Sequence, residues 1–325
     1  MTNSFREAEL SGWTARADSY DRLFTPISDQ AIPSILAVLG NICGKHILDV
    51  CCGPGHLTAA LTAKGAEAQG LDFAQTMVAR ASTTYPGIRF RQGDAERLPY
   101  GSNLFDHVVC CYGVMHLEQP DSAIGEAHRV LQPGGKYIFT QWAKDDELLK
   151  MVASAIATHG DHSVELPATP PLMRFGDPDE CRRTLVLSGF DEVTVDRIEL
   201  EWRSDRAEAL LELIHGSAVR AAMLIDSQAP AHRAKIHEAI IIASGGNTPG
   251  NPIVVRRPTL LACGVKAVLD CRSLAKERPT FATDRFRPLV STADLLSTQV
   301  HLQRSARPRS RRRRLTQAAT GDFGT

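Results

Sequence analysis

Asp49-Val50-Cys51-Cys52-Gly53-Pro54-Gly55 is the stretch that decides the fold of this 325-residue chain. The apolar run His46–Val50 predicts a β-strand that ends in this stretch, and the residues from Leu57 to Lys64 have helical character. A strand, a glycine turn and a helix in this order are typical of an α/β sheet. In doubly wound sheets, ligands bind beyond the carboxyl ends of the strands, where glycines let the backbone approach them. We therefore expect Gly53 and Gly55 to lie beside a ligand.

The alternation of strand and helix continues along the chain. Further strands are predicted over residues 66–71, 88–92, 105–111 and 136–142, with helices over 74–82 and 123–131 between them. This spacing indicates a parallel sheet with right-handed crossovers. Residues 5–40 have helical spacing. After Lys144 a looser pattern predicts helices over 145–160 and 179–187, a strand over 193–202, two helices within 206–243 separated by Pro230, and a last strand within 252–268.

Composition restricts the class of protein. The chain is 43% hydrophobic and 23% charged, and it has no run of about 18 apolar residues, the length that a membrane-spanning helix needs. The N-terminus lacks a basic segment followed by an apolar stretch, so we expect a cytoplasmic protein without a secretory signal. The eight cysteines include no C-x-x-C spacing, which favours reduced thiols. His159 and His162 lack a third metal ligand, so no metal site is expected.

The net charge of zero hides an uneven distribution. From Asp270 to the C-terminus the chain has 12 Lys or Arg against 5 Asp or Glu, whereas the residues before it have 25 against 32. Seven arginines lie between Arg304 and Arg314, and no periodic pattern persists in this part of the chain. We therefore predict that residues 269–325 form a disordered, basic tail. Deleting residues 272–325 is expected to leave ligand affinity unchanged.

The carboxylate of Asp49 indicates which ligand the glycine turn accepts. A dinucleotide site would have a third glycine near position 58, where Thr58 stands, and a carboxylate beside the turn would repel a pyrophosphate. The same carboxylate suits a ligand with a positively charged ammonium or sulfonium group. Asp49 therefore favours S-adenosylmethionine, and a nicotinamide-dependent oxidoreductase is the alternative.

Two more acids follow the next strands. Asp72 ends the second strand, 19 residues after Gly53, where a carboxylate can accept both hydroxyls of a ribose. Asp94 ends the third strand and is placed to accept from an adenine amino group. Each of these acids alone can equally cap the next helix. Three acids at successive strand ends, beside a glycine turn, favour a nucleoside site.

With these motifs the chain resembles the class I S-adenosylmethionine-dependent methyltransferases, close to the small-molecule branch that includes the ubiquinone and menaquinone biosynthesis methyltransferases. The resemblance covers roughly residues 40–145. It is carried by the 49–55 loop, Leu71-Asp72, Gly93-Asp94-Ala95 with Leu98-Pro99, Phe105-Asp106, Arg129-Val130-Leu131 and Pro133-Gly134-Gly135. It implies a Rossmann-like, doubly wound α/β sheet of seven strands with S-adenosylmethionine as cofactor. The implied organisation is an N-terminal helical lid (1–40), a methyltransferase domain (41–268) with a helical cap (about 145–175 and 204–248), and the basic tail.

The resemblance also implies a set of site residues. Gly53 and Gly55 would pack under the methionine and ribose portions, Asp94 and Ala95 would bracket adenine, and residues 111–113 would border the sulfonium. Tyr20 matches an N-terminal helix that often folds over the cofactor. The full set of expected cofactor-binding residues is Tyr20, Asp49, Cys51, Gly53, Gly55, Asp72, Phe73, Asp94, Ala95 and Cys111.

Methyl transfer depends mainly on the alignment of donor and acceptor, and it needs a general base only when the acceptor must lose a proton. His116 follows the fourth strand and is the best-placed candidate base, with packing against the lid as the alternative role. Tyr112 is the second candidate catalytic residue, although such an aromatic residue is more often part of a core.

The expected acceptor is a small organic molecule. The apolar residues of the region 145–250 can wall an acceptor pocket or form a small core of their own; they are Met151, Leu172, Met173, Phe175, Leu213 and Met223. The segment 111–114 lacks the motif that holds exocyclic base amines, and the acidic body discourages binding to a phosphate backbone. A non-catalytic nucleoside-binding protein and a nucleic-acid methyltransferase that uses the basic tail are the alternatives. No specific nucleic acid and no membrane insertion are expected.

Overall fold

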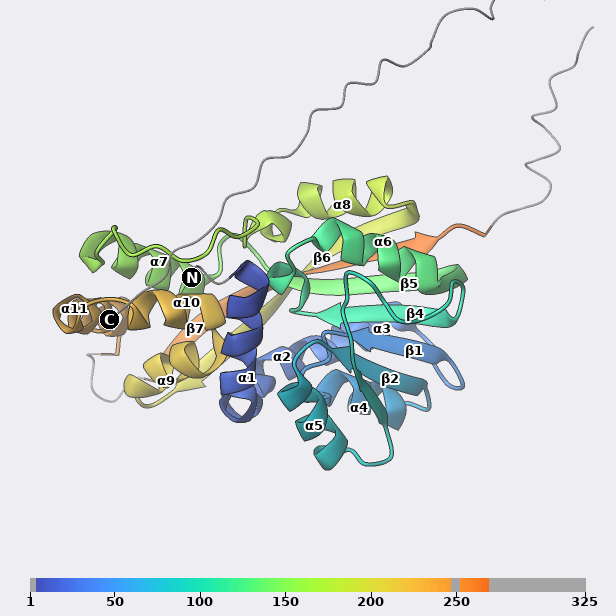
Figure 1. Ribbon diagram of the computed structural model, residues 1–325, viewed down its shortest axis with the longest axis horizontal. Helices are drawn as coiled ribbons and strands as arrows, with labels where there is room; N and C mark the ends of the chain where they lie inside the picture. Colours follow the sequence, from blue (N-terminus) through green and yellow to red (C-terminus); the bar gives the residue numbers. More distant parts are fainter. Residues whose placement is uncertain (1–3, 247–251, 269–325) are drawn as a thin grey trace, which may run out of the picture. The chain divides into compact units, whose positions relative to one another are not determined.

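The computed structural model describes residues 4–246 and 252–268, and a seven-stranded sheet runs through them (Figure 1). The strand order is β3-β2-β1-β4-β5-β7-β6. The strands are β1 (His46–Val50), β2 (Glu67–Asp72), β3 (Arg89–Gln92), β4 (Phe105–Cys111), β5 (Leu131–Trp142), β6 (Phe190–Ser204) and β7 (Ile253–Lys266). The Rossmann-like, doubly wound fold class predicted from the sequence is confirmed.

Strands β1 to β5 pair in parallel, as predicted. The last strand, for which no direction was predicted, lies between β5 and β6 and is antiparallel to both. A helix connects each pair of successive parallel strands except β3 and β4. Strand β7 runs in the opposite direction, between β5 and β6. The period of apolar residues identifies a strand but does not fix its direction in the sheet.

The helices follow the predicted pattern with two differences. They are α1 (Phe5–Leu23), α2 (Thr25–Ser28), α3 (Ile32–Leu39), α4 (His56–Ala63), α5 (Gln75–Thr84), α6 (Pro120–Val130), α7 (Glu147–His159), α8 (Pro178–Leu187), α9 (Glu208–Ser217), α10 (Val219–Asp226) and α11 (Pro230–Ala243), with short 3-10 helices at Asp29–Ala31, Val114–His116 and Arg174–Gly176. The region 5–40 is broken after Leu23, just before Pro26. The region 206–243 contains three helices instead of two, because Ala218 leaves the helical conformation (φ −112°, ψ 89°) and Pro230 begins α11.

Alternate residues of the central strands pack on opposite faces of the sheet. Ile47 and Val109 belong to one apolar cluster together with side chains of α3, α4, α7 and α11. Leu48 and Val108 belong to a second cluster with side chains of α6 and α8. Burying one large apolar side chain stabilises a fold by about 1.5–3 kcal/mol, so the two clusters hold the strands rigidly under the site.

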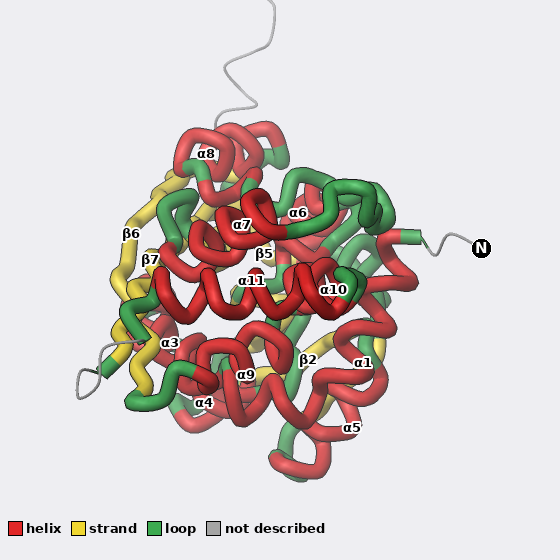
Figure 2. Tube along the Cα trace, turned by 90° about the vertical axis from the view of Figure 1, so that its left-hand side faces the viewer, coloured by secondary structure: helices red, strands yellow, loops and turns green. Residues whose placement is uncertain are grey.

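Helices α7, α9, α10 and α11 gather at one end of the molecule, and α1 stands between them and the parallel half of the sheet (Figures 1 and 2). Helix α1 contacts α5, α9 and α10. Its first turn is fixed by a capping box in which Ser4 and Glu7 bond each other's backbone N–H groups. Helix α1 therefore separates the helices α7, α9, α10 and α11 from the parallel strands.

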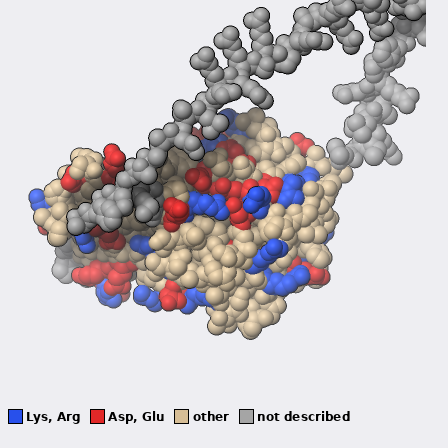
Figure 3. Space-filling view, viewed as in Figure 1, with Lys and Arg blue, Asp and Glu red and all other residues tan. Residues whose placement is uncertain are grey.

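Acidic and basic side chains lie next to each other on the face shown in Figure 3. Pairs such as Asp121 with Arg174, 2.6 Å apart, are of this kind. No helix of the described part of the chain is long and apolar enough to cross a membrane. The predicted basic tail, residues 269–325, lies outside the described residues.

Candidate active site

The chain leaves β1 and β4 toward opposite edges of the sheet, although these strands are neighbours. Ligands of doubly wound sheets bind at this switch point. A cavity of about 720 Å³, its open mouth included, lies here, and we call it the strand-end cavity. It is lined by Arg6, Trp13, Tyr20, Cys51, Gly53, Leu71, Asp72, Phe73, Met77, Gly93, Asp94, Ala95, Glu96, Cys111, Tyr112, Gly113, His116, Leu117 and Glu118.

This lining brings together 10 of the 12 site residues predicted from the sequence. They are Tyr20, Cys51, Gly53, Asp72, Phe73, Asp94, Ala95, Cys111, Tyr112 and His116. The two predicted residues that do not line it are Asp49 and Gly55. Four acidic side chains and one basic side chain line the cavity, so its wall favours a cationic ligand.

Asp72 is held by the backbone on both sides of its carboxylate. The N–H of Gly53 donates to Asp72 Oδ2 and the N–H of Ala74 donates to Oδ1, each at 2.9 Å. A carboxylate has about four acceptor positions, so each oxygen keeps a lone pair for a hydroxyl in the cavity. Burial raises the pKa of Asp72 to about 6. The side chain is thus oriented to accept from a diol.

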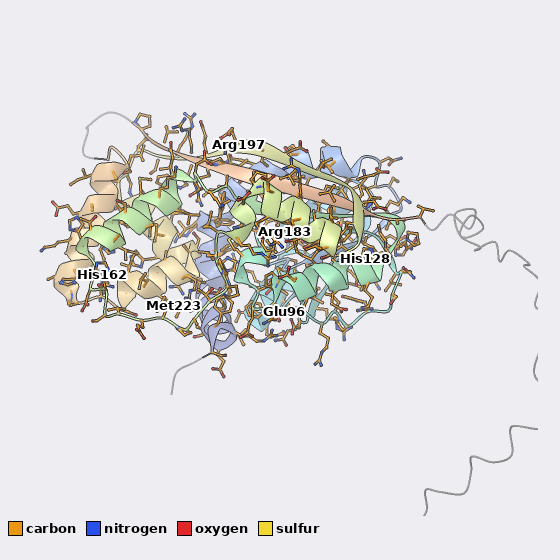
Figure 4. The ribbon with its side chains drawn as sticks, turned by 90° about the horizontal axis from the view of Figure 1, so that it is seen from above. Glu96, His128, His162, Arg183, Arg197 and Met223 are labelled. Carbon is orange, nitrogen blue, oxygen red and sulfur yellow. The ribbon has the colours of Figure 1, made fainter. Side chains whose placement is uncertain are left out.

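Asp94 is tied to the N-terminal helix. Arg6 Nη2 lies 2.8 Å from Asp94 Oδ2, while the N–H of Glu96 donates to Oδ1 at 2.9 Å. Both partners of the ion pair are partly exposed, so its contribution is about 0.2–1 kcal/mol. Figure 4 shows α1 between labelled Glu96 on one side and labelled Met223 of α10 on the other.

A smaller cavity of about 420 Å³, which we call the loop cavity, shares Tyr20, Cys51, Gly53 and Cys111 with the strand-end cavity. Asp49 lines this loop cavity. Its Oδ2 accepts from Thr58 Oγ1 at 2.6 Å, but its Oδ1 is buried and has no hydrogen-bond partner among the described residues. Burial raises the pKa of Asp49 to about 7.

An unpartnered carboxyl oxygen with a raised pKa is the arrangement that a cationic group would relieve. Thr58 stands where a dinucleotide fold has its third glycine, and here its hydroxyl fixes the Asp49 carboxyl instead. Both observations fit an ammonium-bearing ligand that extends from the strand-end cavity into the loop cavity.

Gly55 lines none of the cavities described here. Its φ is +89°, and a Cβ at this position would lie 2.7 Å from Cζ of Phe90. Its role is therefore close packing between the start of α4 and β3. The expectation that Gly55 packs under a ligand has no contact in the structure to support it.

The thiols of the site are protonated at neutral pH. A hydrogen bond with Cys110, and then burial, raise the pKa of Cys51, and burial raises that of Cys111. Cys51 has φ +57°, in the left-handed region, and its Cβ would lie 2.5 Å from a Cβ at Gly113. These small side chains let the loops after β1 and β4 pack closely.

A third cavity of about 720 Å³, which we call the cap cavity, lies against the strand-end cavity. Trp13, Tyr20, Tyr112 and His116 line both. The other residues that line the cap cavity are Phe24, Met115, Trp142, Leu148, Leu149, Val152, Leu172, Met173, Ile214, Ser217, Ala218, Val219, Arg220, Ala221 and Arg257. Leu172 and Met173, from the predicted apolar pocket, are among them, whereas Met151, Phe175, Leu213 and Met223 are not.

His116 lies at the shared wall and is held by a buried acid. Its Nδ1 lies 2.9 Å from Oε2 of Glu9, which is only 1% exposed and also accepts from Trp13 Nε1. The ring meets Trp13 edge to face at 4.8 Å. His116 therefore packs on α1, one of the two roles considered from the sequence, and the buried carboxylate of Glu9 fixes the orientation of its ring.

Tyr112 has a different environment. Its hydroxyl lies 2.9 Å from Thr259 Oγ1, and its ring stacks on Trp142 with centroids 4.2 Å apart. Burial raises the pKa of Tyr112 well above its ordinary value, so the phenol stays neutral. These contacts suit a wall residue better than a base.

Glu9, Arg6 and Trp13 were missed by the sequence reasoning. A signal was present, because positions 6, 9, 13 and 20 share one face of a helix at spacings of three, four and seven residues. Counting back from Tyr20 would have found them. No signal of this kind marked Arg220 or Arg257. Among the described residues, no group of three or more His, Cys, Asp or Glu is arranged to hold a metal.

Comparison with known proteins identifies the domain. Residues 48–139 match the family model of a methyltransferase domain. A demethylmenaquinone methyltransferase from Staphylococcus epidermidis is 34% identical over 132 residues, which is 38% of this chain and 55% of that protein. One from Renibacterium salmoninarum is 31% identical over 109 residues, 34% and 46% of the two chains. The chain spans about half the length of these relatives.

Solved structures show the same fold. Phosphoethanolamine N-methyltransferase 2 from Haemonchus contortus, in complex with S-adenosylhomocysteine, superimposes with a TM-score of 0.53 at 16% identity, over 82% of this chain and 61% of that one. The [4+2]-cyclase SpnF gives 0.51 at 19% identity, over 82% and 98%. Residues 48–139 therefore match a methyltransferase domain, as the resemblance predicted.

Proposed function

We propose that the protein transfers the methyl group of S-adenosylmethionine to a small organic acceptor. One observation carries the proposal: an acidic cavity at the switch point adjoins an apolar cavity through a common wall that contains His116. The matched methyltransferase domain supports the first half of this statement, and the composition of the cap cavity supports the second.

The residues divide the recognition of the cofactor among themselves. Asp72 accepts from the ribose hydroxyls, and Asp94 with Ala95 holds the adenine ring. The free Oδ1 of Asp49 meets the ammonium group in the loop cavity. When bound, the sulfonium supplies an activated methyl group that leaves by in-line displacement.

The acceptor enters from the cap cavity and is aligned against the common wall. Alignment of two reactants supplies up to about 7–11 kcal/mol of a barrier in favourable cases, so placement is the main task of the wall. His116 takes the proton that the acceptor loses, and the buried carboxylate of Glu9 keeps the ring oriented.

A cytoplasmic location is part of this proposal. The described cysteines are all free, as is usual for proteins of a reducing compartment.

Two measurements on the purified full chain test the proposal. In calorimetry, S-adenosylhomocysteine is expected to bind and NADH is not, and Asp72→Asn should weaken binding about 10- to 100-fold, since a hydrogen bond to a charged group contributes about 1.5–3 kcal/mol. Binding of NADH alone would contradict the cofactor assignment.

Methyl transfer itself needs a second readout, because a fold of this class also serves a cyclase. Release of S-adenosylhomocysteine is measured against a panel of small phenols, amines and acids, with and without single-stranded RNA as a rival acceptor. Binding of cofactor without transfer to any member would favour the non-catalytic nucleoside-binding protein. Transfer to RNA alone would favour the nucleic-acid methyltransferase.

A further inference from the structure

The cap cavity has an unusual charge composition for a mainly apolar cavity. Its titratable lining residues are Tyr20, Tyr112, His116, Arg220 and Arg257, and no carboxylate is among the described residues that line it. The strand-end cavity, on the other side of the same wall, is lined by four acidic residues. A neutral acceptor would need no guanidinium in such a cavity, so the two arginines require an explanation.

Arg257 is explained by its own contacts. The side chain is 3% exposed, and its Nε donates to Asp146 Oδ2 at 2.5 Å. Its Cζ lies 3.8 Å from the centroid of the Trp142 ring, which in turn stacks on Tyr112. The charge of Arg257 is thus paired, and its flat guanidinium extends an aromatic stack along one wall. Such a wall fits a planar ring.

Arg220 of α10 has no such partner. Its Nη2 donates to the carbonyl oxygen of Pro167 at 2.9 Å, and its Cζ lies 5.4 Å from the ring of Phe5. Its Nη1 is buried and has no hydrogen-bond partner among the described residues, and no carboxylate of the described chain pairs with it. A buried donor on a permanent positive charge is costly when it is left unpaired.

We propose that the cap cavity binds an acceptor that joins a planar apolar body to a carboxylate, and that Arg220 Nη1 donates to this carboxylate. The inference rests on the proposed function and names its substrate class. The planar body lies along the stack of Arg257, Trp142 and Tyr112. Arg220 lines the cap cavity but not the strand-end cavity, so the carboxylate lies away from the common wall. The reacting atom, at the other end of the acceptor, lies at that wall beside His116. A planar carboxylate matches the N–H donors of a guanidinium.

Probe binding tests this class without knowledge of the acceptor. Naphthoate, its uncharged isostere naphthamide and the neutral naphthoquinone are titrated into the full chain by calorimetry, both alone and with saturating S-adenosylhomocysteine. Wild type is expected to bind naphthoate at least tenfold more tightly than naphthamide. Equal affinities, or tighter binding of naphthoquinone than of naphthoate, would overturn the proposal.

Variants then assign the preference to one side chain. Arg220→Gln is expected to remove the preference for naphthoate while naphthamide affinity changes by less than twofold, and Arg220→Lys should keep part of it. Arg203→Gln is the matched control, since Arg203 pairs with exposed Glu201 and lines none of the cavities. A preference that survives in Arg220→Gln would contradict the assignment.

The two proposals fail separately. A chain that prefers naphthoate but binds no S-adenosylhomocysteine would refute the proposed function and leave an anion-binding cavity. A chain that binds S-adenosylhomocysteine without a preference for naphthoate would keep the methyltransferase and refute the carboxylate acceptor.

Discussion

The strand-end cavity and the cap cavity have the same volume, about 720 Å³, and share four wall residues, yet their charges are opposite. Acidic side chains such as Asp72 and Asp94 line the first, whereas Arg220 and Arg257 line the second. An electrostatic field of this kind sorts ligands by sign before any specific contact forms. The proposed cationic methyl donor and the proposed anionic acceptor can therefore reach the common wall from two sides without competing.

The two cavities are also built differently. The strand-end cavity collects residues that directly follow β1, β2, β3 and β4, so its geometry depends on the rigid sheet. The cap cavity collects residues from α1, α7, α9, α10 and β7, which are far apart in the chain. Its shape therefore depends on how the cap helices pack against each other.

Replacing His116 is expected to have the largest effect, because this residue lies at the wall that the two cavities share. His116→Gln is expected to lower kcat about 100-fold or more with an acceptor that loses a proton, since general bases contribute about 10²–10⁴-fold. S-adenosylhomocysteine affinity should change by less than twofold. Rates of S-adenosylhomocysteine release and calorimetry give the two numbers.

Glu9→Gln is the companion variant for His116. It alters the hydrogen bond that orients the imidazole ring, so kcat should fall, by less than in His116→Gln, while S-adenosylhomocysteine affinity changes by less than twofold. A loss of cofactor affinity in His116→Gln with an unchanged kcat would instead assign this residue to cofactor binding.

The contrast in construction also explains what the sequence could predict. Asp72 and Asp94 are recognisable because each ends a strand whose apolar pattern is local, and the sheet then brings the strand ends together. Arg220 gave no local signal of function, because its contact with Pro167 spans more than 50 residues of the chain. Glu9 had only its helical spacing from Tyr20 as a signal, and its contact with His116 depends on the folded chain.

Asp49 shows a finer limit of sequence reasoning. The sequence predicted a carboxylate beside the ligand, and the structure gives this carboxyl a place in the loop cavity with one unpartnered oxygen. Neither the hydrogen bond from Thr58 nor the raised pKa could be inferred from the order of residues, since the first depends on how α4 packs beside β1 and the second results from burial.

Titration of Asp49 is the next test, with an expected effect of about tenfold. Because its pKa is about 7 in the folded protein, lowering the pH from 8 to 6 protonates the carboxyl. Affinity for S-adenosylhomocysteine, which carries an ammonium group, should fall up to about tenfold. Methylthioadenosine, which lacks that group, is the control ligand. It shares the ribose contact to Asp72, so the ratio of the two affinities isolates Asp49.

The same pKa has a consequence for stability. A folded-state pKa raised above the unfolded value means that ionisation destabilises the fold, and the loss grows as pH rises from about 4 to about 7. Asp49→Asn should therefore be more stable than wild type at pH 8, by about 1–3 kcal/mol, and equal to it near pH 4. Urea unfolding measures both. A pH-independent difference would show that Asp49 is ionised throughout, and the ligand-affinity ratio would then be flat as well.

The smallest expected effect comes from the ion pair that links Arg6 of α1 to Asp94 of the strand-end cavity. Arg6→Gln removes the partly exposed ion pair with Asp94, which contributes about 0.2–1 kcal/mol, so S-adenosylhomocysteine should dissociate about 1.5- to 5-fold faster. Because salt screens exposed pairs, wild type at 1 M salt should approach the variant's rate. Stopped-flow dissociation measures this, and naphthoate affinity serves as the readout for the cap cavity. A change in naphthoate affinity of similar size would mean that α1 moves as one wall of both cavities, and the two cavities would then be mechanically coupled despite their different charges.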